Sequence, residues 1–423
     1  MPPGPFIAKD PRVVVLLDAN SFPILFDNSK ILKRNVFEGT YMASTSFSGG
    51  YRVCSQLDPS EPKHASLKNY FFSILASKHD KFIPLLRQSM SVLFSNLDQQ
   101  ISNKPEVELN ALSDSESFNF VFSLFCGQHP SQTKSLGEKA SSIADKWLVP
   151  QVSPIVTLGV PKILSVIEDL LLHTFPLPFF LIKSNYTKLY EAFYSSTSNN
   201  LLADAAKFGI EKEEACHNLI FLSCFNTYGG LKVLIPAIFK WVGRGGKSLH
   251  RQLADEIRTV VKQEGGVTFA SLEKMSLTKS VAYEVLRIEP PVPFQYGNAK
   301  EDIVVESHDA SFKIKKGEMV FGFQPFATRD PKVFDKAEDF VGDRFVGLGE
   351  KLLKYVFWSN GRESDKPTAD NKQCPGRDLV VLVARVVLVE FFLRYDTFEV
   401  EDKLFLVGSK VTFKSLTKAS SAV

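Results

Sequence analysis

The chain has 423 residues, 44% of them hydrophobic and 23% charged, which is the composition of a globular protein with enough apolar residues for a large core. Its 50 lysines and arginines and 47 acidic residues give a formal net charge of +3, and no basic cluster contains interleaved aromatic residues, so nucleic acid is excluded as an expected partner. The five cysteines have no C-x-x-C spacing, which argues against a disulfide framework or a structural zinc site and favours a reducing compartment.

The sequence predicts neither a signal peptide nor a membrane span. Its start has no charged segment followed by an apolar one, and we expect no run of about 20 uncharged apolar residues. The chain contains 36 phenylalanines. An interior rich in phenylalanine suits an apolar ligand or a large flat cofactor, but it is equally typical of an ordinary packed core.

The predicted elements run from a short β segment into a long helical body. Residues 13–17 form the expected strand, and a second element follows at 22–26. From about residue 60 to about residue 290, apolar residues recur at spacings of three and four, which predicts helices. Glycines at 243–246 predict a turn within this body.

The second part of the chain changes to short alternating segments, which predict strands at 303–305 and 312–314. A long loop over 335–368 leads to a cysteine, and a helix and a β-like segment at 398–413 close the chain. No linker or repeat divides the sequence. We therefore expect a mainly α protein with a smaller β region, as one domain over 1–423 whose helical body ends at about residue 290.

Cys374 is the residue around which we expect the chemistry to be organised. It lies between a polar loop and the start of a predicted helix, where backbone amides and the helix dipole lower a thiol pKa and favour the metal-ligating thiolate. Gly376 allows close backbone approach to a flat cofactor. Taken alone, Cys-Pro-Gly is more often a simple turn.

Charged residues upstream of the cysteine form an ordered series. Glu284 and Arg287 share one face of a predicted helix over 280–288, so this pair can bridge to a third partner in the loop before the cysteine. Arg344 follows in that loop, and the string Trp-Ser-Asn-Gly at 358–361 leads on to the cysteine. The order and spacing of these residues carry more information than any one of them.

The chain resembles the cytochrome P-450 haem-thiolate family in three motifs, which follow one another in the family's order: Glu284-x-x-Arg287, the segment 343–345 and Cys374-x-Gly376. The resemblance extends over essentially the whole chain. Further strings resemble the plant subfamily that metabolises fatty-acid hydroperoxides, whose members are allene oxide synthases, hydroperoxide lyases and divinyl ether synthases. These strings lie at 39–42, 48–53, 225–232, 279–284, 358–361 and 371–374.

The resemblance implies that Cys374 is the axial ligand to the iron of haem b, with Gly376 beside it. Glu284, Arg287 and Arg344 are then the structural support of the cysteine loop. Oxygen-activating relatives carry an acid and a threonine in the central helix, whereas the matching turn at 224–230 contains no acid. Because the substrate brings its own O–O bond, neither O2 nor a reductase is expected, and the thiolate favours O–O cleavage.

The resemblance also assigns two residues to catalysis. Asn226 matches the helix asparagine that hydrogen-bonds the hydroperoxide, a task that suits an amide because it both donates and accepts; the alternative is an asparagine that satisfies its own helix. Phe37 matches an aromatic position of the synthases, where a π face stabilises a developing cation by about 0.5–2 kcal/mol; the alternative is simple packing. Thr227 is expected to bond locally.

Haem propionates require cations, and the resemblance supplies four candidates. His64 and Lys68 are four residues apart and so share one face of a starting helix, and Lys372 is a further basic residue two positions before the cysteine. Related sequences carry arginine or lysine where this chain has Asn298, so we expect Lys300 to substitute there.

The expected function is that of an allene oxide synthase acting on a 9- or 13-hydroperoxide of a C18 fatty acid, in oxylipin biosynthesis. Two alternatives stay open, a hydroperoxide lyase and an inactive acyl-lipid binding protein. Relatives begin earlier, so we expect an N-terminally shortened chain, intracellular, in plastid or cytoplasm. A Phe- and Pro-rich loop at 175–180 is expected to make any peripheral membrane contact. The sequence does not predict the oligomeric state.

Overall fold

Helices make up most of the protein, and the computed structural model describes residues 12–36, 41–155, 160–175, 177–196, 199–405 and 408–420. Most helices follow the predicted spacing: the apolar residues of 82–101 that recur every three or four positions are the ones that this helix buries. The helices are α1 (Pro62–Lys78), α2 (Phe82–Ile101), α3 (Leu109–Cys126), α4 (Ala140–Leu148), α5 (Ser165–Glu168), α6 (Lys183–Ser196), α7 (Asn199–Asp204), α8 (Lys212–Ile220), α9 (Gly229–Glu264), α10 (Phe269–Glu273), α11 (Ser276–Ile288), α12 (Gln324–Thr328) and α13 (Arg377–Phe392).

The strands form three small sheets, in the orders β1-β7-β4-β2, β3-β9-β8 and β5-β6. Among the described strands, only β1 and β7 pair in parallel, with Val13 opposite Met319. The strands are β1 (Val13–Leu16), β2 (Ile31–Leu32), β3 (Val107–Glu108), β4 (Phe294–Ala299), β5 (Ile303–Glu306), β6 (Ser311–Ile314), β7 (Met319–Phe323), β8 (Tyr395–Leu404) and β9 (Ser409–Lys418).

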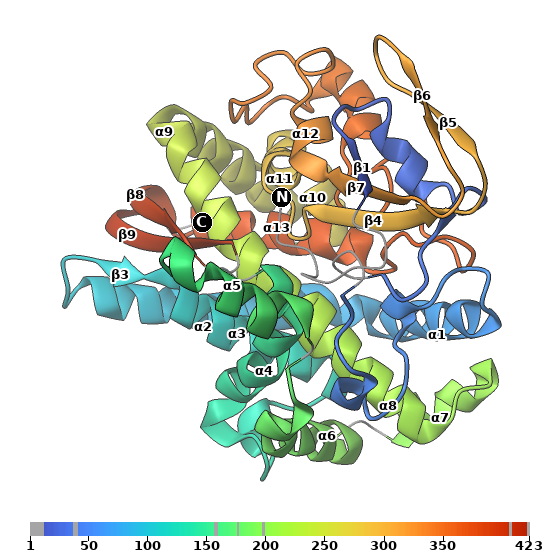
Figure 1. Ribbon diagram of the computed structural model, residues 1–423. Helices are drawn as coiled ribbons and strands as arrows, with labels where there is room; N and C mark the ends of the chain where they lie inside the picture. Colours follow the sequence, from blue (N-terminus) through green and yellow to red (C-terminus); the bar gives the residue numbers. More distant parts are fainter. Residues whose placement is uncertain are drawn as a thin grey trace.

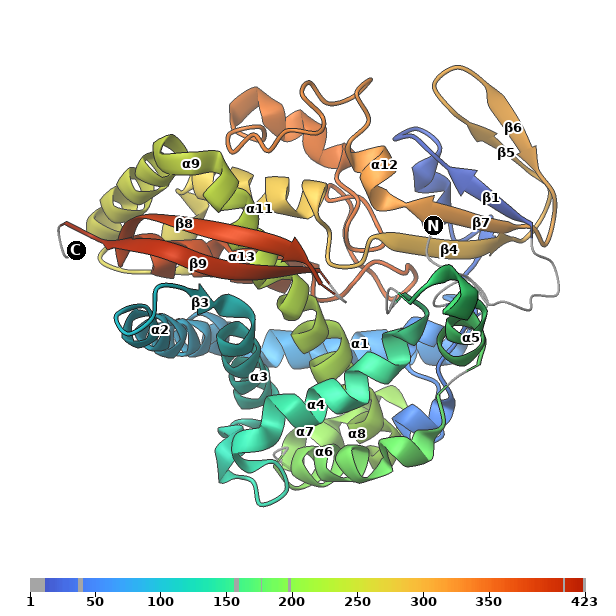
Figure 2. The same cartoon turned by 60° about the vertical axis from the view of Figure 1, so that its left-hand side comes forward.

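The sheet that contains β1, β4 and β7 lies apart from the helical body. Figure 1 shows this sheet and the β5–β6 hairpin at the upper right, with α1 to α4 and α6 to α8 across the lower half, and Figure 2 shows the same separation from the side. The prediction of a mainly α fold with a smaller β region is confirmed. The predicted strands at 303–305 and 312–314 are β5 and β6.

One central helical run extends through α8, a π-helical turn (Phe221–Tyr228) and α9. The turn predicted at 243–246 is confirmed in part: α9 is helical through Gly243, and two helical stretches meet at a break at Gly246, whose φ of 72° and ψ of −177° are not helical. The run Lys212–Glu264 contains a window that is apolar enough to span a membrane by length and composition alone. However, 67% of its apolar window is buried inside the protein, as in the core helix of a globular protein.

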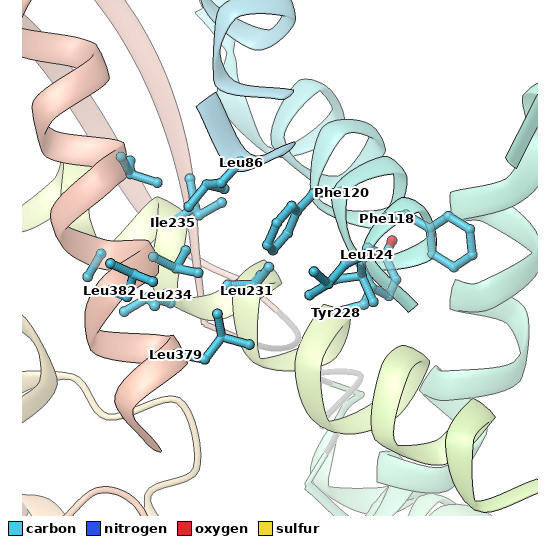
Figure 3. Close-up of a cluster of buried hydrophobic side chains, with 14 of the residues drawn as sticks. Leu86, Phe118, Phe120, Leu124, Tyr228, Leu231, Leu234, Ile235, Leu379 and Leu382 are labelled. Carbon is cyan, nitrogen blue, oxygen red and sulfur yellow. The ribbon is translucent and has the colours of Figure 1, made fainter. Parts of the chain in front are cut away.

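The larger of the two hydrophobic cores lies around α9. Figure 3 shows Leu231 of α9 with Phe120 of α3 on one side and Leu382 of α13 on the other. Each of these side chains is buried, and full burial of one such side chain stabilises the fold by about 1.5–3 kcal/mol relative to its exposure. The core therefore fixes α13, the helix that follows the cysteine loop, against the central helix.

The smaller core lies under the four-stranded sheet and reaches the start of the cysteine loop. The rings of Phe22 and Phe357 stack with their centroids 5.4 Å apart and their planes 1° apart. A Cβ at Gly322 of β7 would lie 2.4 Å from the Phe22 ring, so the strand passes directly over it and only glycine fits. This core thus anchors the residue from which the cysteine loop departs.

Candidate active site

Cys374 lies in a loop that folds back on itself. Its N–H donates to Ser359 O at 2.8 Å, and the buried Gln373 side chain donates to Ser359 Oγ at 3.2 Å and to Arg362 O at 2.8 Å. A Cβ at Gly361 would lie 2.7 Å from Gln373 Cδ, so glycine is needed for the loop to close over this side chain. The string at 358–361 therefore positions the cysteine through backbone and amide contacts.

The thiol of Cys374 is half-buried, and burial raises its pKa above the ordinary value. The hydrogen bond from Gly376 and the charges of Lys68 and Arg377 act in the opposite direction but do not outweigh burial. The expectation of a lowered thiol pKa is therefore wrong for the protein without a metal. A metal ion at the sulfur would remove the proton outright.

Gly376 leaves the surface beside the sulfur open. A Cβ at this position would lie 3.8 Å from Cys374 Sγ, in van der Waals contact, so any side chain here would occupy the space next to the thiol. A single sulfur donor with open space beside it suits a flat, metal-containing cofactor better than a closed four-ligand metal site. The residues around the thiol therefore fit haem.

Two basic residues of α1 face the segment just before the cysteine. His64 Nδ1 donates to Ala369 O at 3.1 Å, and Lys68 Nζ donates to Asn371 O and, at 3.0 Å, to Asn371 Oδ1. Burial, with Lys372 and Lys68 nearby, lowers the pKa of His64 to about 4, so it is neutral at physiological pH. Burial lowers the pKa of Lys68 to about 8.

Two further lysines complete this basic cluster, which comprises Lys33, His64, Lys68 and Lys372. Lys372 Nζ donates to the carbonyls of Ser55 at 2.9 Å and Leu57 at 2.8 Å. Burial, followed by repulsion from Lys372, lowers the pKa of Lys33 to about 7. Buried cations that repel one another favour the binding of an anion among them.

Lys33 was not predicted from the sequence. Its Nζ donates to Gln295 Oε1 at 3.2 Å and to Asn360 Oδ1 at 2.5 Å, and the Asn360 amide in turn donates to Lys372 O at 3.1 Å. The sequence signal is slight, a lysine directly after the apolar pair of β2. Lys300, the predicted substitute for a cation at position 298, instead donates to Asn28 O at 2.6 Å.

Glu284, Arg287 and Arg344 meet in a buried cluster. Arg287 donates through Nε and Nη2 to the two Glu284 oxygens at 2.6 and 2.8 Å, and Arg344 Nε lies 3.0 Å from both oxygens. Arg287 Nη1 also donates to the carbonyls of Thr328 and Ala337, each at 2.8 Å. The cluster ties α11 to the loop that leads to the cysteine, as the i, i+3 spacing had suggested.

The π-helical turn carries Asn226, whose side chain is accessible. Thr227 Oγ1 donates to Leu222 O at 2.8 Å, so this hydroxyl is used within the turn, as expected. Turns of this kind interrupt α-helices most often at functional sites. Phe37, the other predicted catalytic residue, lies outside the described residues.

Comparisons with known proteins agree with this arrangement. The family model for Cytochrome P450 matches residues 247–398, which include the Glu284 cluster and Cys374. Allene oxide synthase 3 of Solanum lycopersicum is 54% identical over 422 residues, which cover 100% of this chain and 86% of that protein. The chain belongs to the cytochrome P450 family. In this family a cysteine thiolate holds haem iron.

Other relatives place this P450 in the plant subfamily that metabolises fatty-acid hydroperoxides. Allene oxide synthase 2 of Oryza sativa subsp. japonica is 54% identical over 100% of this chain and 87% of that protein. Divinyl ether synthase of Solanum tuberosum is 50% identical over 99% of this chain and 88% of that protein. The subfamily resemblance seen in the sequence strings is thereby confirmed.

Proposed function

We propose that this P450 is an allene oxide synthase, which dehydrates a C18 fatty-acid hydroperoxide to an allene oxide in oxylipin biosynthesis. The observation that carries the proposal is the identity of 54% to Allene oxide synthase 3 over the full chain. The sequence of the π-helical turn supports the proposal, since residues 224–230 contain an amide, two hydroxyls and a thiol but no carboxylate to protonate bound O2. The reaction then needs neither O2 nor a reductase.

The proposed cofactor is haem b, with Cys374 as the axial ligand. Thiolate-ligated haem iron supplies homolytic cleavage of the hydroperoxide O–O bond. Lys33 and Lys68 are the charged residues proposed to hold the propionates, because both are buried and their nearest hydrogen-bond acceptors are uncharged. His64 and Lys372 frame this region, and Lys300 contributes at its edge, 3.5 Å from Asp58.

Asn226 is proposed to orient the hydroperoxide. The residue is exposed, and an amide can accept from the O–H of the hydroperoxide while donating to an oxygen of the same group. Phe37 is proposed to stabilise the positive charge that develops after O–O cleavage, before a proton is lost. Those two roles favour dehydration over cleavage of the carbon chain.

We further propose peripheral contact with a membrane, through an apolar patch on residues 163–181. Ile163 is 86% exposed and Phe180 is 74% exposed, and Val166, Ile167, Leu171 and Leu181 are each more than half exposed. Apolar side chains gathered in this way on one short segment are uncommon on the surface of a protein that acts only in water. The substrate, an amphiphilic fatty acid, resides in membranes, so this contact would bring the enzyme to it.

Vesicle flotation tests the membrane proposal. Ile163→Ser/Phe180→Ser should reduce binding to phosphatidylcholine vesicles at least several-fold, whereas Val304→Ser/Phe312→Ser, which removes an exposed apolar pair of the β5–β6 hairpin, should leave it unchanged. Equal effects of the two variants would refute the role of the patch in membrane binding.

We propose the plastid as the location of this P450. Relatives from Solanum lycopersicum and Arabidopsis thaliana carry "chloroplastic" in their names.

Product analysis tests the function. The haem-loaded protein is given the 9- and the 13-hydroperoxide of a C18 fatty acid, without NADPH and under argon. An allene oxide, trapped as its hydrolysis ketol, is the expected product. Chain-cleavage aldehydes would instead establish a hydroperoxide lyase, and tight binding without turnover would establish an acyl-lipid binding protein.

A further inference from the structure

The π-helical turn that carries Asn226 is braced at its first half by α4. Trp147 of α4 is fully buried and packs edge-to-face on Phe221 and Phe225, with ring centroids 6.2 and 6.5 Å apart. The two phenylalanine rings stack on each other at 4.5 Å. Trp147 is itself fixed, since its Nε1 donates to Phe47 O at 2.9 Å. This aromatic contact holds the turn on the side that precedes Asn226.

The other end of the turn is held by a part-buried polar network, which comprises the buried Tyr228 and the partly exposed Asp145, Lys232 and Asp114. Tyr228 OH donates to Asp145 Oδ1 at 2.8 Å, and Lys232 Nζ lies 3.1 Å from the same oxygen. Lys232 Nζ also donates to Asp114 of α3. Tyr228 is fully buried, and Figure 3 shows its ring beside Phe118 and Leu124 of α3.

The close approach of α4 to Gly229 is consistent with these contacts. A Cβ at Gly229, the residue directly after the turn, would lie 2.9 Å from Leu148 Cδ1 at the end of α4, so α4 approaches more closely than a side chain at 229 would allow. Contacts from three residues of α4, Asp145, Trp147 and Leu148, therefore place this helix against both ends of the turn. Asn226 is the accessible residue between the two fixed ends.

We infer that Tyr228 is a positioning residue, which acts through Asn226 by fixing the end of the π-helical turn to Asp145 of α4. This inference rests on the proposed role of Asn226. A π-helical turn has a strained ladder of hydrogen bonds, so its shape depends on side chains outside it. Asn226 can orient a hydroperoxide only if its amide is held in one place, and loss of the Tyr228 anchor lets the turn relax toward an ordinary helix.

Tyr228→Phe tests the inference, since it removes one hydroxyl and keeps the ring. The matched control is Tyr395→Phe, which removes another buried hydroxyl, one that donates to Phe94 O at 3.3 Å far from the turn in sequence. Tyr228→Phe should lower kcat about ten-fold or more and raise KM, with the Soret band little changed, because small misplacements of an orienting group reduce the rate steeply and weaken its contact with the substrate. Tyr395→Phe should leave kcat and KM unchanged.

A double-mutant cycle with Asn226→Ala separates positioning from general damage. The second readout is the dissociation constant of the non-reactive C18 hydroxy acid, measured from its change in the haem spectrum. Tyr228→Phe should weaken this binding in the wild-type background and have no effect in the Asn226→Ala background, since its action passes through the amide. An equal weakening in both backgrounds would overturn the inference.

These measurements distinguish an error in the proposed role of Asn226 from an error in the inferred role of Tyr228. If Asn226→Ala keeps full kcat and full affinity for the hydroxy acid, the proposed role of Asn226 is wrong and the inference falls with it. If Asn226→Ala loses both while Tyr228→Phe behaves like Tyr395→Phe, the role of Asn226 stands and the inference alone is wrong.

Discussion

Arg287 holds Glu284 through two hydrogen bonds, of 2.6 and 2.8 Å, with both side chains fully shielded from water. Arg344 binds the same carboxylate from the loop that leads to the cysteine. One carboxylate therefore balances two buried guanidinium groups. Because a buried charge without a partner is far more costly than a broken surface pair, this relationship makes the loop depend on α11.

Replacing Glu284 should destabilise the protein severely. Glu284→Gln leaves two buried guanidinium groups without a counter-charge, so the free energy of unfolding should fall by about 3–5 kcal/mol. Glu301→Gln, at an exposed glutamate, should change it by less than about 0.5 kcal/mol. Urea denaturation measures both, and similar values for the two variants would contradict the structural role of the cluster.

Removing a buried cation near the cysteine loop should weaken haem retention. Lys68→Met keeps the length and apolar stem of the side chain but removes its charge, so the dissociation constant for haem should rise about ten-fold or more. Lys33→Met should act in the same direction, and Lys316→Met, at an exposed lysine, should not. Haem titration of the purified protein measures this, and unchanged affinity for both buried-lysine variants would exclude them as propionate ligands.

Phe37→Leu should shift the product spectrum toward chain cleavage. An aromatic face stabilises a developing cation by about 0.5–2 kcal/mol, which is a change of about two- to thirty-fold in a branching ratio. The measurement is the ratio of ketol to aldehyde from the same hydroperoxide. Identical ratios for the wild type and the variant would show that Phe37 does not direct the branch.

The stability of the protein should depend on pH through Asp114. Burial raises the pKa of this carboxyl to about 6, against the opposing charge of Lys232. The folded state therefore takes up a proton before the unfolded state does, so stability rises as pH falls through 6. Relative to Asp114→Asn, the wild type should gain about 1 kcal/mol of unfolding free energy between pH 7 and pH 5. A difference that stays constant over this range would contradict the raised pKa.

The parts of the fold that depend on local spacing could be predicted from the sequence. The pair Glu284 and Arg287 is three residues apart on one helix, and the helix after Cys374 follows from its apolar run. Both are present as expected, because i, i+3 geometry and amphipathic periodicity need no knowledge of distant contacts.

Features that depend on contacts between distant segments could not be predicted. Lys33 lies 327 positions from Asn360, its hydrogen-bond partner, and nothing near it in the sequence reveals this contact. The glycines at 243–246 predicted the break that occurs at Gly246, but they did not reveal that a Cβ at Gly243 would lie 2.7 Å from Val400 of β8, where glycine serves packing between distant segments. The thiol pKa of Cys374 was misjudged because local helix electrostatics were visible and burial was not.

The absorption spectrum of Cys374→Ala protein, recorded after reconstitution with haem, tests whether Cys374 is the iron ligand. This variant should lose the thiolate-type spectrum and the consumption of the fatty-acid hydroperoxide, whereas Cys126→Ala, at a buried cysteine of α3, should keep both. A Cys374→Ala variant that retained the wild-type spectrum and hydroperoxide turnover would contradict the assignment of Cys374 as the iron ligand.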